Sequence, residues 1–345
     1  MSRSEEMTHG SRGLVDVERL RIRCPICGSR RRCSVREESP AIALCYHEGS
    51  SKESKDGGWI HYLDESTAAR LPRAEALPPE CERAPDHVLD HAYRTLLEHC
   101  GLSTAHRLAL RRRGLLDAHI EHAGYASLER TGRAALARAI VSAVGEDNAR
   151  RVPGYILGGD GFDRWASIAG SPGLLVPCRD VHGRILGLQV RRDNPSPEQG
   201  KYAWLSSRAQ GGAGRSTFAH VPVFPSWDRG EVVITEGPIK ADVSTVLTGR
   251  FVVAIPGVSA WQRAVDLCAE VKPRLAWVAL DADLSINRHV RHALDQLRDG
   301  LTAAGIEYRV LRWPLSEGKG LDDMLLKHRD GFERAVEWSK RKGLQ

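Results

Sequence analysis

The last third of the chain alternates between short apolar runs and longer amphipathic stretches. Apolar runs at 231–235, 251–255, 274–280 and 306–312 have the length of strands, and the stretches between them carry apolar residues at helical spacing. Strands that alternate regularly with helices predict a parallel sheet covered by helices on both faces. We therefore expect an α/β domain over residues 231–340.

The pattern upstream of this domain is different. Apolar runs at 173–177 and 185–192 flank a polar turn at 180–183, which predicts an antiparallel hairpin. Residues 87–150 carry apolar positions at helical spacing and predict a helical segment. Several short apolar runs within residues 33–63 have the length of strands, so we expect a small β module near the start of the chain.

Composition narrows the class of protein. The chain has 345 residues, of which 41% are hydrophobic and 27% are charged, and this excludes a wholly disordered protein. Its apolar runs fall short of the ~18 residues that a membrane helix needs, and the first residues lack an apolar signal region. We therefore expect a cytoplasmic protein without a membrane partner. The net charge of +6 permits nucleic-acid binding, because arginines cluster locally, as at 111–113.

Half of the eight cysteines lie close together, at Cys24, Cys27, Cys33 and Cys45. The Cys-x2-Cys spacing of the first two is typical of a tight turn that brings two thiolates onto one ion. Four thiolates satisfy the tetrahedral preference of Zn²⁺ and leave no open position. We therefore predict a structural zinc ribbon, in which His47 is an alternative to Cys33 as a ligand.

These observations divide the chain into five segments and predict a multidomain α/β protein. The linker is predicted from its prolines and acidic residues, and the remaining segments from the patterns above. The expected order is a zinc β-ribbon at 14–63, a linker at 64–86, a helical segment at 87–150, a basic mixed α+β subdomain at 151–230, and the parallel α/β domain at 231–340.

Acidic residues follow two of the apolar strands in the last third of the chain. Glu236 closes the first strand, and Asp281 and Asp283 follow the third. Ligands of open α/β sheets bind at the carboxyl ends of strands, and residues i and i+2 of a strand point the same way. We therefore expect the three carboxylates to converge. Oxygen ligands suit Mg²⁺, although acids at these positions are also compatible with helix caps.

The order of these motifs resembles the TOPRIM domain. A strand ending in Glu236-Gly, a strand followed by Pro256-Gly, and a strand ending in Asp281-x-Asp283 occur here in that sequence. DnaG-like primases, topoisomerases and some nucleases share this domain, and the resemblance covers about residues 231–330. It implies that Glu236, Asp281 and Asp283 bind catalytic Mg²⁺ or Mn²⁺.

Other segments resemble primases of phages, plasmids and integrated elements. The run 318–323, Gly-Lys-Gly-Leu-Asp-Asp, is similar to a Lys-Gly-x-Asp-Asp element of primase-helicases and adds Lys319 and Asp322 to the candidate residues. A zinc ribbon upstream of a TOPRIM domain is also typical of bacterial and phage primases. The hairpin resembles their basic subdomain. The candidates for nucleotide or template binding are therefore Arg191, Arg192, Lys201, Lys240, Lys319 and Asp322.

The resemblance implies a primase that transfers nucleotides by Mg²⁺-dependent phosphoryl transfer. Its partners would be a single-stranded DNA template, nucleoside triphosphates and a separate replicative helicase, and its metals would be structural Zn²⁺ and catalytic Mg²⁺ or Mn²⁺. There are two alternatives: a TOPRIM nuclease that uses the same acids, and a non-catalytic replication-accessory protein that binds DNA and has a degenerate centre. The intact acidic triad argues against the accessory protein. The zinc ribbon and the basic hairpin favour the primase.

Overall fold

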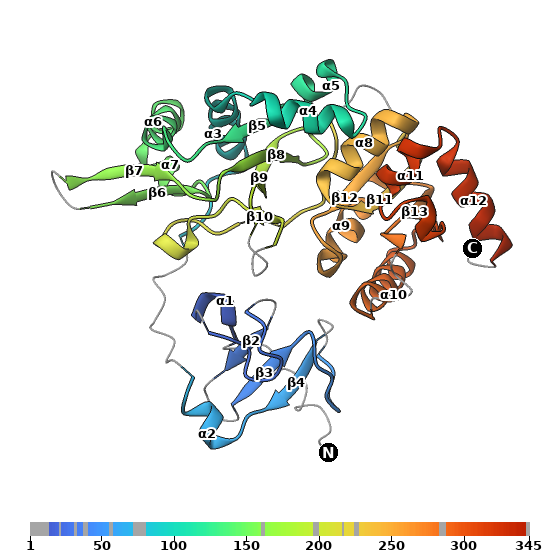
Figure 1. Cartoon of the computed structure of the whole chain (residues 1–345), viewed down its shortest axis with the longest axis horizontal. Coiled ribbons are helices and arrows are strands. Elements are labelled where there is room, and N and C mark those ends of the chain that lie inside the picture. Colours follow the sequence, from blue (N-terminus) through green and yellow to red (C-terminus); the bar gives the residue numbers. More distant parts are fainter. Residues whose placement is uncertain are drawn as a thin grey trace. The chain divides into compact units, whose positions relative to one another are not determined.

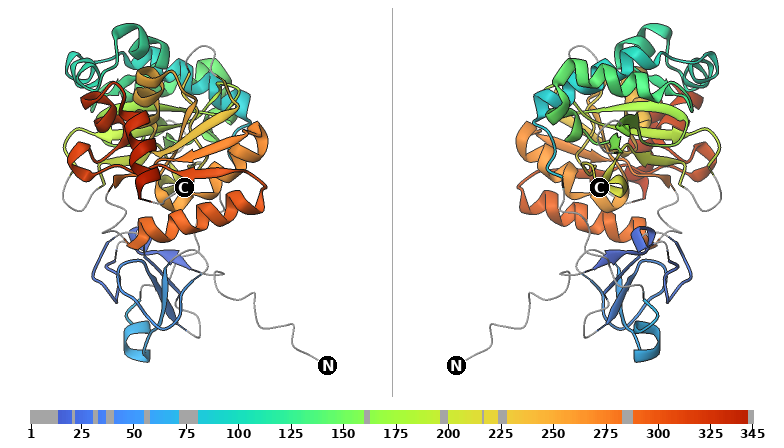
Figure 2. Two further views of the ribbon diagram at one scale, coloured as in Figure 1. Left: turned by 90° about the vertical axis from the view of Figure 1, so that its right-hand side faces the viewer. Right: turned by 90° about the vertical axis from the view of Figure 1, so that its left-hand side faces the viewer.

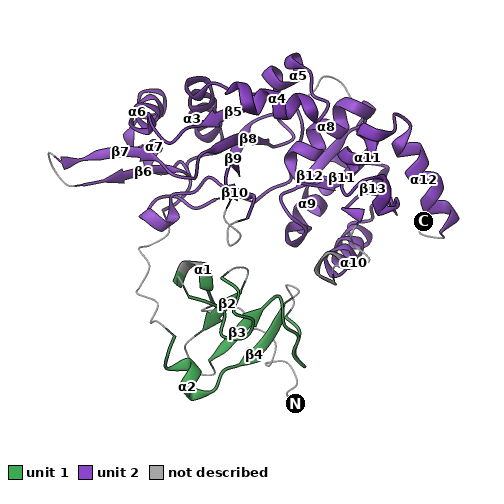
Figure 3. Cartoon of the chain, in the orientation of Figure 1, with its two compact units in different colours: residues 1–78 green, residues 79–345 purple. Residues whose placement is uncertain are grey.

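The structure is a computed structural model. It describes residues 14–20, 22–30, 33–36, 41–54, 58–71, 81–159, 163–195, 200–215, 217–223, 228–282 and 288–342. The chain forms two compact units, residues 1–78 and residues 79–345 (Figure 3). Within the described ranges, no helix has the length and apolar character of a membrane span.

The first unit is built on a four-stranded antiparallel sheet in the order β1-β2-β3-β4 (Figure 1). Its elements are β1 Val15–Asp16, α1 Val17–Leu20, β2 Ser34–Arg36, β3 Ile42–Cys45, β4 Trp59–Tyr62 and α2 Glu65–Ala68. The core is small: Val17, Val35 and Ala43 form one buried cluster with Cys24, Cys33 and Cys45. The β module predicted for this region is confirmed. Residues 72–80 of the expected linker lie outside the described residues.

The second unit begins with helices that cover an antiparallel sheet of order β10-β9-β8-β5. The helices are α3 Asp86–Cys100, α4 Thr104–Arg112, α5 Asp117–Ala123, α6 Arg133–Val144 and α7 Glu146–Arg150. The strands are β5 Ala126–Leu128, β8 Gly173–Arg179, β9 Ile185–Arg192 and β10 Tyr202–Trp204. A separate hairpin pairs β6 Tyr155–Gly158 with β7 Trp165–Ile168, and the short 3-10 helix η2 spans Arg208–Gln210.

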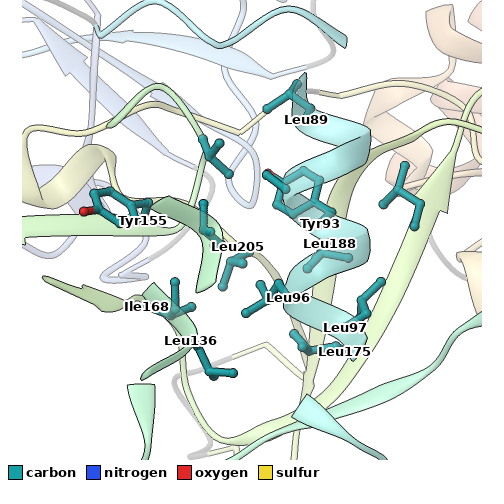
Figure 4. Packing of buried hydrophobic residues seen from close by; sticks show 14 of the residues in the cluster. Leu89, Tyr93, Leu96, Leu97, Leu136, Tyr155, Ile168, Leu175, Leu188 and Leu205 are labelled. Carbon is teal, nitrogen blue, oxygen red and sulfur yellow. The ribbon is translucent and has the colours of Figure 1, made fainter. Parts of the chain in front are cut away.

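Helix α3 joins the helical segment to the sheet. Its residues Leu89, Tyr93 and Leu96 recur at helical spacing and are fully buried. They pack with Leu175 of β8 and Leu188 of β9 in one hydrophobic cluster (Figure 4). The hydroxyl of Tyr93 donates a hydrogen bond to the Pro153 carbonyl at 3.1 Å. Helices α3 and α6 and the antiparallel sheet therefore share one core, whereas α4 and α5 pack against the sheet in a separate cluster.

A parallel sheet of order β12-β11-β13-β14 completes the chain. Its strands are β11 Glu231–Glu236, β12 Val252–Ile255, β13 Leu275–Val278 and β14 Tyr308–Val310. Its helices are α8 Pro238–Thr248, α9 Gln262–Val271, α10 Arg288–Ala303, α11 Leu321–Lys327 and α12 Gly331–Arg341, with short 3-10 helices η3 Val258–Ala260 and η5 Leu315–Glu317. The predicted parallel α/β arrangement is confirmed.

Successive residues of the central strand face opposite sides of this sheet. Val232 and Ile234 pack in the cluster that α9 and α10 cover, whereas Val233 packs with Trp277 in the cluster that α11 and α12 cover. Figure 2 shows these two pairs of helices on opposite sides of the strands. A strand buried on both faces explains why the sequence shows continuous apolar runs here and no polar alternation.

Candidate functional site

The four clustered cysteines of the first unit come together in space. The sulfur atoms of Cys24, Cys27, Cys33 and Cys45 all lie within 4.8 Å of one another. The Cys45 sulfur accepts the backbone N–H groups of His47 at 3.4 Å and Glu48 at 3.3 Å. Such N–H groups stabilise negative charge on a thiolate ligand.

The Cys24 turn repeats this arrangement. A hydrogen bond from Cys33 lowers the pKa of Cys24 to about 5, and the backbone N–H groups of Cys27 and Ile26, which face the Cys24 sulfur, contribute to this shift. The imidazole Nδ1 of His47 lies 3.4 Å from the Cys27 sulfur and 3.5 Å from the Cys33 sulfur. His47 therefore lies beside the four-cysteine cluster. Four sulfur donors without an open position fit structural zinc.

The carboxyl edge of the parallel sheet carries two of the three predicted acids. Glu236 is the last residue of β11. Ile234 pairs with Val278, and the N–H of Ala279 donates to the Ile234 carbonyl at 2.8 Å. Glu236 and Asp281 therefore leave the sheet at the same edge, each shortly after this pairing. Asp283 lies outside the described residues.

Two lysines contact the carboxylate of Asp281. The Lys240 ammonium, on the first turn of α8, forms an ion pair with Oδ1, and the Lys319 ammonium lies 3.9 Å from Oδ2. The side chain of Asp281 is only 10% exposed, so these charges act in a partly dry environment. The N–H of Ala282 donates to the Lys319 carbonyl at 2.8 Å and holds that loop against the sheet edge.

The same loop places Asp322 beside Lys240. Asp322 Oδ2 accepts a hydrogen bond from Arg113 at 3.1 Å, whereas its Oδ1 is buried without a hydrogen-bond partner. Burial raises the pKa of Asp322, and the charge of Arg113 opposes that shift. A Cβ atom on Gly320 would lie 2.5 Å from Asp322 Oδ1 and 3.1 Å from Lys240 Cε. Glycine at this position therefore keeps space open between the two charged groups.

Lys201 and Arg191 form a cationic cluster next to this loop. Tyr202 pairs with Arg191 across β10 and β9, which brings Lys201 to the end of β9. Burial, followed by the charges of Arg191 and Arg113, lowers the pKa of Lys201, and Asp323 opposes the shift. Lys201 of the antiparallel sheet therefore lies near the charges of Arg113, at the end of α4, and of Asp323 in α11.

Arg192 has a different environment from Arg191. Its guanidinium donates to the Ser171 hydroxyl at 3.3 Å and to the Gly200 carbonyl. These contacts tie the end of β9 to the two flanking loops.

The donor set at the carboxyl edge fits a hard divalent cation. Glu236 and Asp281 supply carboxylate oxygens, the buried Oδ1 of Asp322 has no hydrogen-bond donor, and Gly320 leaves room beside it. Oxygen donors of this kind match Mg²⁺ or Mn²⁺. Within the described part of the chain, however, the four cysteines are the only group of three or more metal-ligating side chains as close together as 4.8 Å.

A buried polar network next to α8 was not predicted from the sequence. The Tyr125 hydroxyl donates to Asp242 Oδ2, and His220 Nε2 lies 3.1 Å from Asp242 Oδ1. The backbone N–H of Arg179 donates to His220 Nδ1 at 3.1 Å, so the ring proton lies on Nε2 and points to Asp242. This network fixes α8, which carries Lys240, against β8 of the antiparallel sheet.

The family model of a domain of unknown function, DUF3854, matches residues 228–331, which contain the whole carboxyl edge and the loop at 318–323. Comparison with the curated proteins finds no match to this sequence.

Solved structures of bacterial primases share the fold of the chain. A structure of the RNA polymerase domain of the Mycobacterium tuberculosis primase DnaG, in complex with a double-stranded DNA oligomer that has a 6-nucleotide overhang, matches 74% of this chain and 81% of that chain, with a TM-score of 0.56 and 16% identity. The zinc-binding and RNA polymerase domains of the Aquifex aeolicus primase match 73% of this chain, with a TM-score of 0.53 and 14% identity. The chain spans 61% of the length of that second structure. It thus has a primase-like fold.

Proposed function

We propose that this chain is a primase-like nucleotidyltransferase that synthesises short primers on a single-stranded DNA template. The observation that carries the proposal is the environment of Asp281. This acid lies at the carboxyl edge of a parallel sheet, and the ammonium groups of Lys240 and Lys319 contact it. Phosphoryl transfer depends mainly on positioning and charge neutralisation, and an acidic edge lined by cations supplies both. The primase-like fold supports the same assignment.

Glu236, Asp281 and Asp283 are the residues that would hold Mg²⁺ or Mn²⁺ in this proposal. The bound cation would neutralise the nucleotide's phosphates and activate the primer 3′-hydroxyl. Asp322 lies beside this group and keeps Arg113 and the loop at 318–323 in place. In this proposal, Glu236, Asp281 and Asp283 form the cation site, and Asp322 positions the basic Arg113 beside it.

The basic residues around the edge would bind phosphate groups. We assign Lys240 and Lys319 to the nucleotide, because they already lie at Asp281. Lys201 and Arg191, on the antiparallel sheet, are assigned to the template backbone, and Arg192 supports that surface through its ties to the flanking loops. Contacts to phosphate make binding weaker as salt rises. The zinc ribbon is assigned to the template as well.

We also propose a cellular location and a protein partner for the enzyme. We place the enzyme in the cytoplasm, where nucleoside triphosphates are available. A separate replicative helicase would supply the single-stranded template.

A primer-synthesis assay tests the proposal. The full zinc-loaded chain is incubated with single-stranded templates, labelled ribo- or deoxynucleotides, and Mg²⁺ or Mn²⁺, and the products are sized on a gel. We expect short template-dependent products that require the divalent cation. Shortened template strands in place of new products would indicate a nuclease. DNA binding without either reaction would indicate an accessory protein.

A further inference from the structure

Lys240 contacts the acid that the proposed function assigns to the catalytic cation. Its ammonium pairs with Asp281 Oδ1, and both side chains are mostly buried, at 23% and 10% exposed. Its stem runs past Gly320, where an added Cβ atom would lie 3.1 Å from Cε and 3.2 Å from Cδ. The packing therefore directs the ammonium to the carboxylate and leaves part of the side chain open to solvent.

Other cations already neutralise this edge of the sheet. The Lys319 ammonium lies 3.9 Å from Asp281 Oδ2, and Arg113 pairs with Asp322 at 3.1 Å. A divalent cation at Asp281 would have to compete with a tethered ammonium for the same oxygen atoms, and like charges this close repel one another strongly at low dielectric. The free protein is thus expected to bind the cation weakly.

We propose that Lys240 exchanges partners: it pairs with Asp281 in the free protein and moves to a nucleotide phosphate when a divalent cation takes its place. Metal and nucleotide then bind cooperatively, because the phosphate accepts the ammonium that the metal displaces. The inference rests on the proposed function for the identity of the nucleotide. It makes Lys240 a regulator of metal entry as well as a phosphate ligand.

Binding of Mn²⁺ tests this exchange without measuring activity. The full zinc-loaded chain is titrated with Mn²⁺, and the free ion is measured by electron paramagnetic resonance, with and without a non-hydrolysable nucleoside triphosphate. Thiolate sites favour Zn²⁺ over Mn²⁺, so the zinc ribbon does not interfere. Without nucleotide, Lys240→Met should bind Mn²⁺ about tenfold more tightly than wild type, because the competing charge is gone.

The nucleotide and the control variants complete the test. The nucleotide should tighten Mn²⁺ binding to wild type, and this gain should be lost in Lys240→Met. Lys240→Arg keeps the competing charge and should therefore keep Mn²⁺ binding weak in the absence of nucleotide. Lys340→Met, which removes an exposed lysine on α12 of the same unit, should also leave Mn²⁺ affinity unchanged. Adding Asp281→Asn to Lys240→Met should abolish the tighter site.

Two results would overturn the exchange: unchanged or weaker Mn²⁺ binding by folded Lys240→Met, or tight binding that survives Asp281→Asn. If Lys240→Met does not fold, a wild-type Mn²⁺ affinity that nucleotide leaves unchanged overturns it equally. Since the readout is metal affinity, this result is separate from primer synthesis. Wild type that makes primers while Lys240→Met keeps the wild-type Mn²⁺ affinity would retain the proposed function and reject the exchange.

Discussion

Arg113 Nη1 lies 3.1 Å from Asp322 Oδ2, and this ion pair joins residues that are 209 positions apart in the sequence. Arg113 ends α4, and Asp322 lies in the first turn of α11, next to the loop that carries Lys319. The Asp322 side chain is 2% exposed, so Arg113 is its main compensating charge. The pair couples the helical segment directly to the acidic edge of the parallel sheet.

Loss of Arg113 should destabilise the second unit. Arg113→Met leaves a buried carboxylate without its cation, which typically costs about 3–5 kcal/mol. Urea unfolding should show this loss, whereas Arg112→Met, at the exposed neighbouring position, should change stability by less than about 0.5 kcal/mol. The double variant Arg113→Met/Asp322→Leu should recover part of the loss, since no charge stays buried. Equal stability of Arg113→Met and Arg112→Met would refute this interpretation.

The zinc centre should hold the first unit together. Metal analysis should give about one zinc per chain, and Cys24→Ser should lose it together with the β-sheet signal of residues 14–71. Half of the buried residues in the core of this unit are the cysteines Cys24, Cys33 and Cys45, so its folding is expected to depend on the metal. The second unit, which has its own cores, should stay folded.

The histidine beside the cluster supplies the matched comparison. His47→Ala should keep zinc at the wild-type ratio, because the four sulfur atoms satisfy the ion without it. Loss of zinc in His47→Ala, with retention in Cys33→Ser, would reverse the ligand assignment.

The buried network around Asp242 should be important for stability. Asp242→Ala leaves the neutral donors of His220 and Tyr125 buried without their acceptor, and we expect a loss of about 2–5 kcal/mol. Tyr125→Phe removes one donor only, for about 1–3 kcal/mol. Asp266→Ala, on the exposed face of α9, is the control and should be nearly neutral. Chemical denaturation of the three variants measures these differences, and a neutral Asp242→Ala would contradict the role given to the network.

Folding stability should fall as the pH rises above about 10. Burial raises the pKa of the Tyr93 phenol above its ordinary value, so the folded protein keeps this proton after unfolded chains have lost theirs. The stabilisation is therefore complete below the unfolded pKa and decreases above it. Urea unfolding at pH 8 and at pH 10.5 measures the slope, which Tyr93→Phe should reduce. Tyr62→Phe, at a side chain that is 60% exposed, should leave the slope unchanged.

Local patterns predicted the elements that carry the site. Continuous apolar runs gave the parallel strands, and the rule that ligands bind at carboxyl strand ends placed Glu236 and Asp281 at one edge. The Cys24-x2-Cys27 spacing predicted a metal turn because that geometry is encoded within four residues. In each case, the determining contacts are short in sequence or follow from the topology of one sheet.

Contacts between elements that are far apart in the chain could not be predicted from the sequence. No local pattern distinguishes Asp242 from other acids on helices, and only packing of α8 against β8 brings Tyr125 and His220 to it. The arginine cluster at 111–113 signalled a charged surface but did not identify Arg113 as the partner of a buried acid. Hydrophobic periodicity reports which face of an element is buried, and it does not report what that face meets.

The most direct test of the central claim compares primer synthesis by wild type, Asp281→Asn and Asp266→Asn under the same conditions. We expect Asp281→Asn to lose primer synthesis by about 100-fold or more, because the nucleotide's phosphates lose their organised counter-charge. Its circular dichroism spectrum and its affinity for single-stranded DNA should stay close to wild type, and Asp266→Asn should be fully active. Near-normal primer synthesis by Asp281→Asn would contradict the assignment of this sheet edge as the catalytic centre.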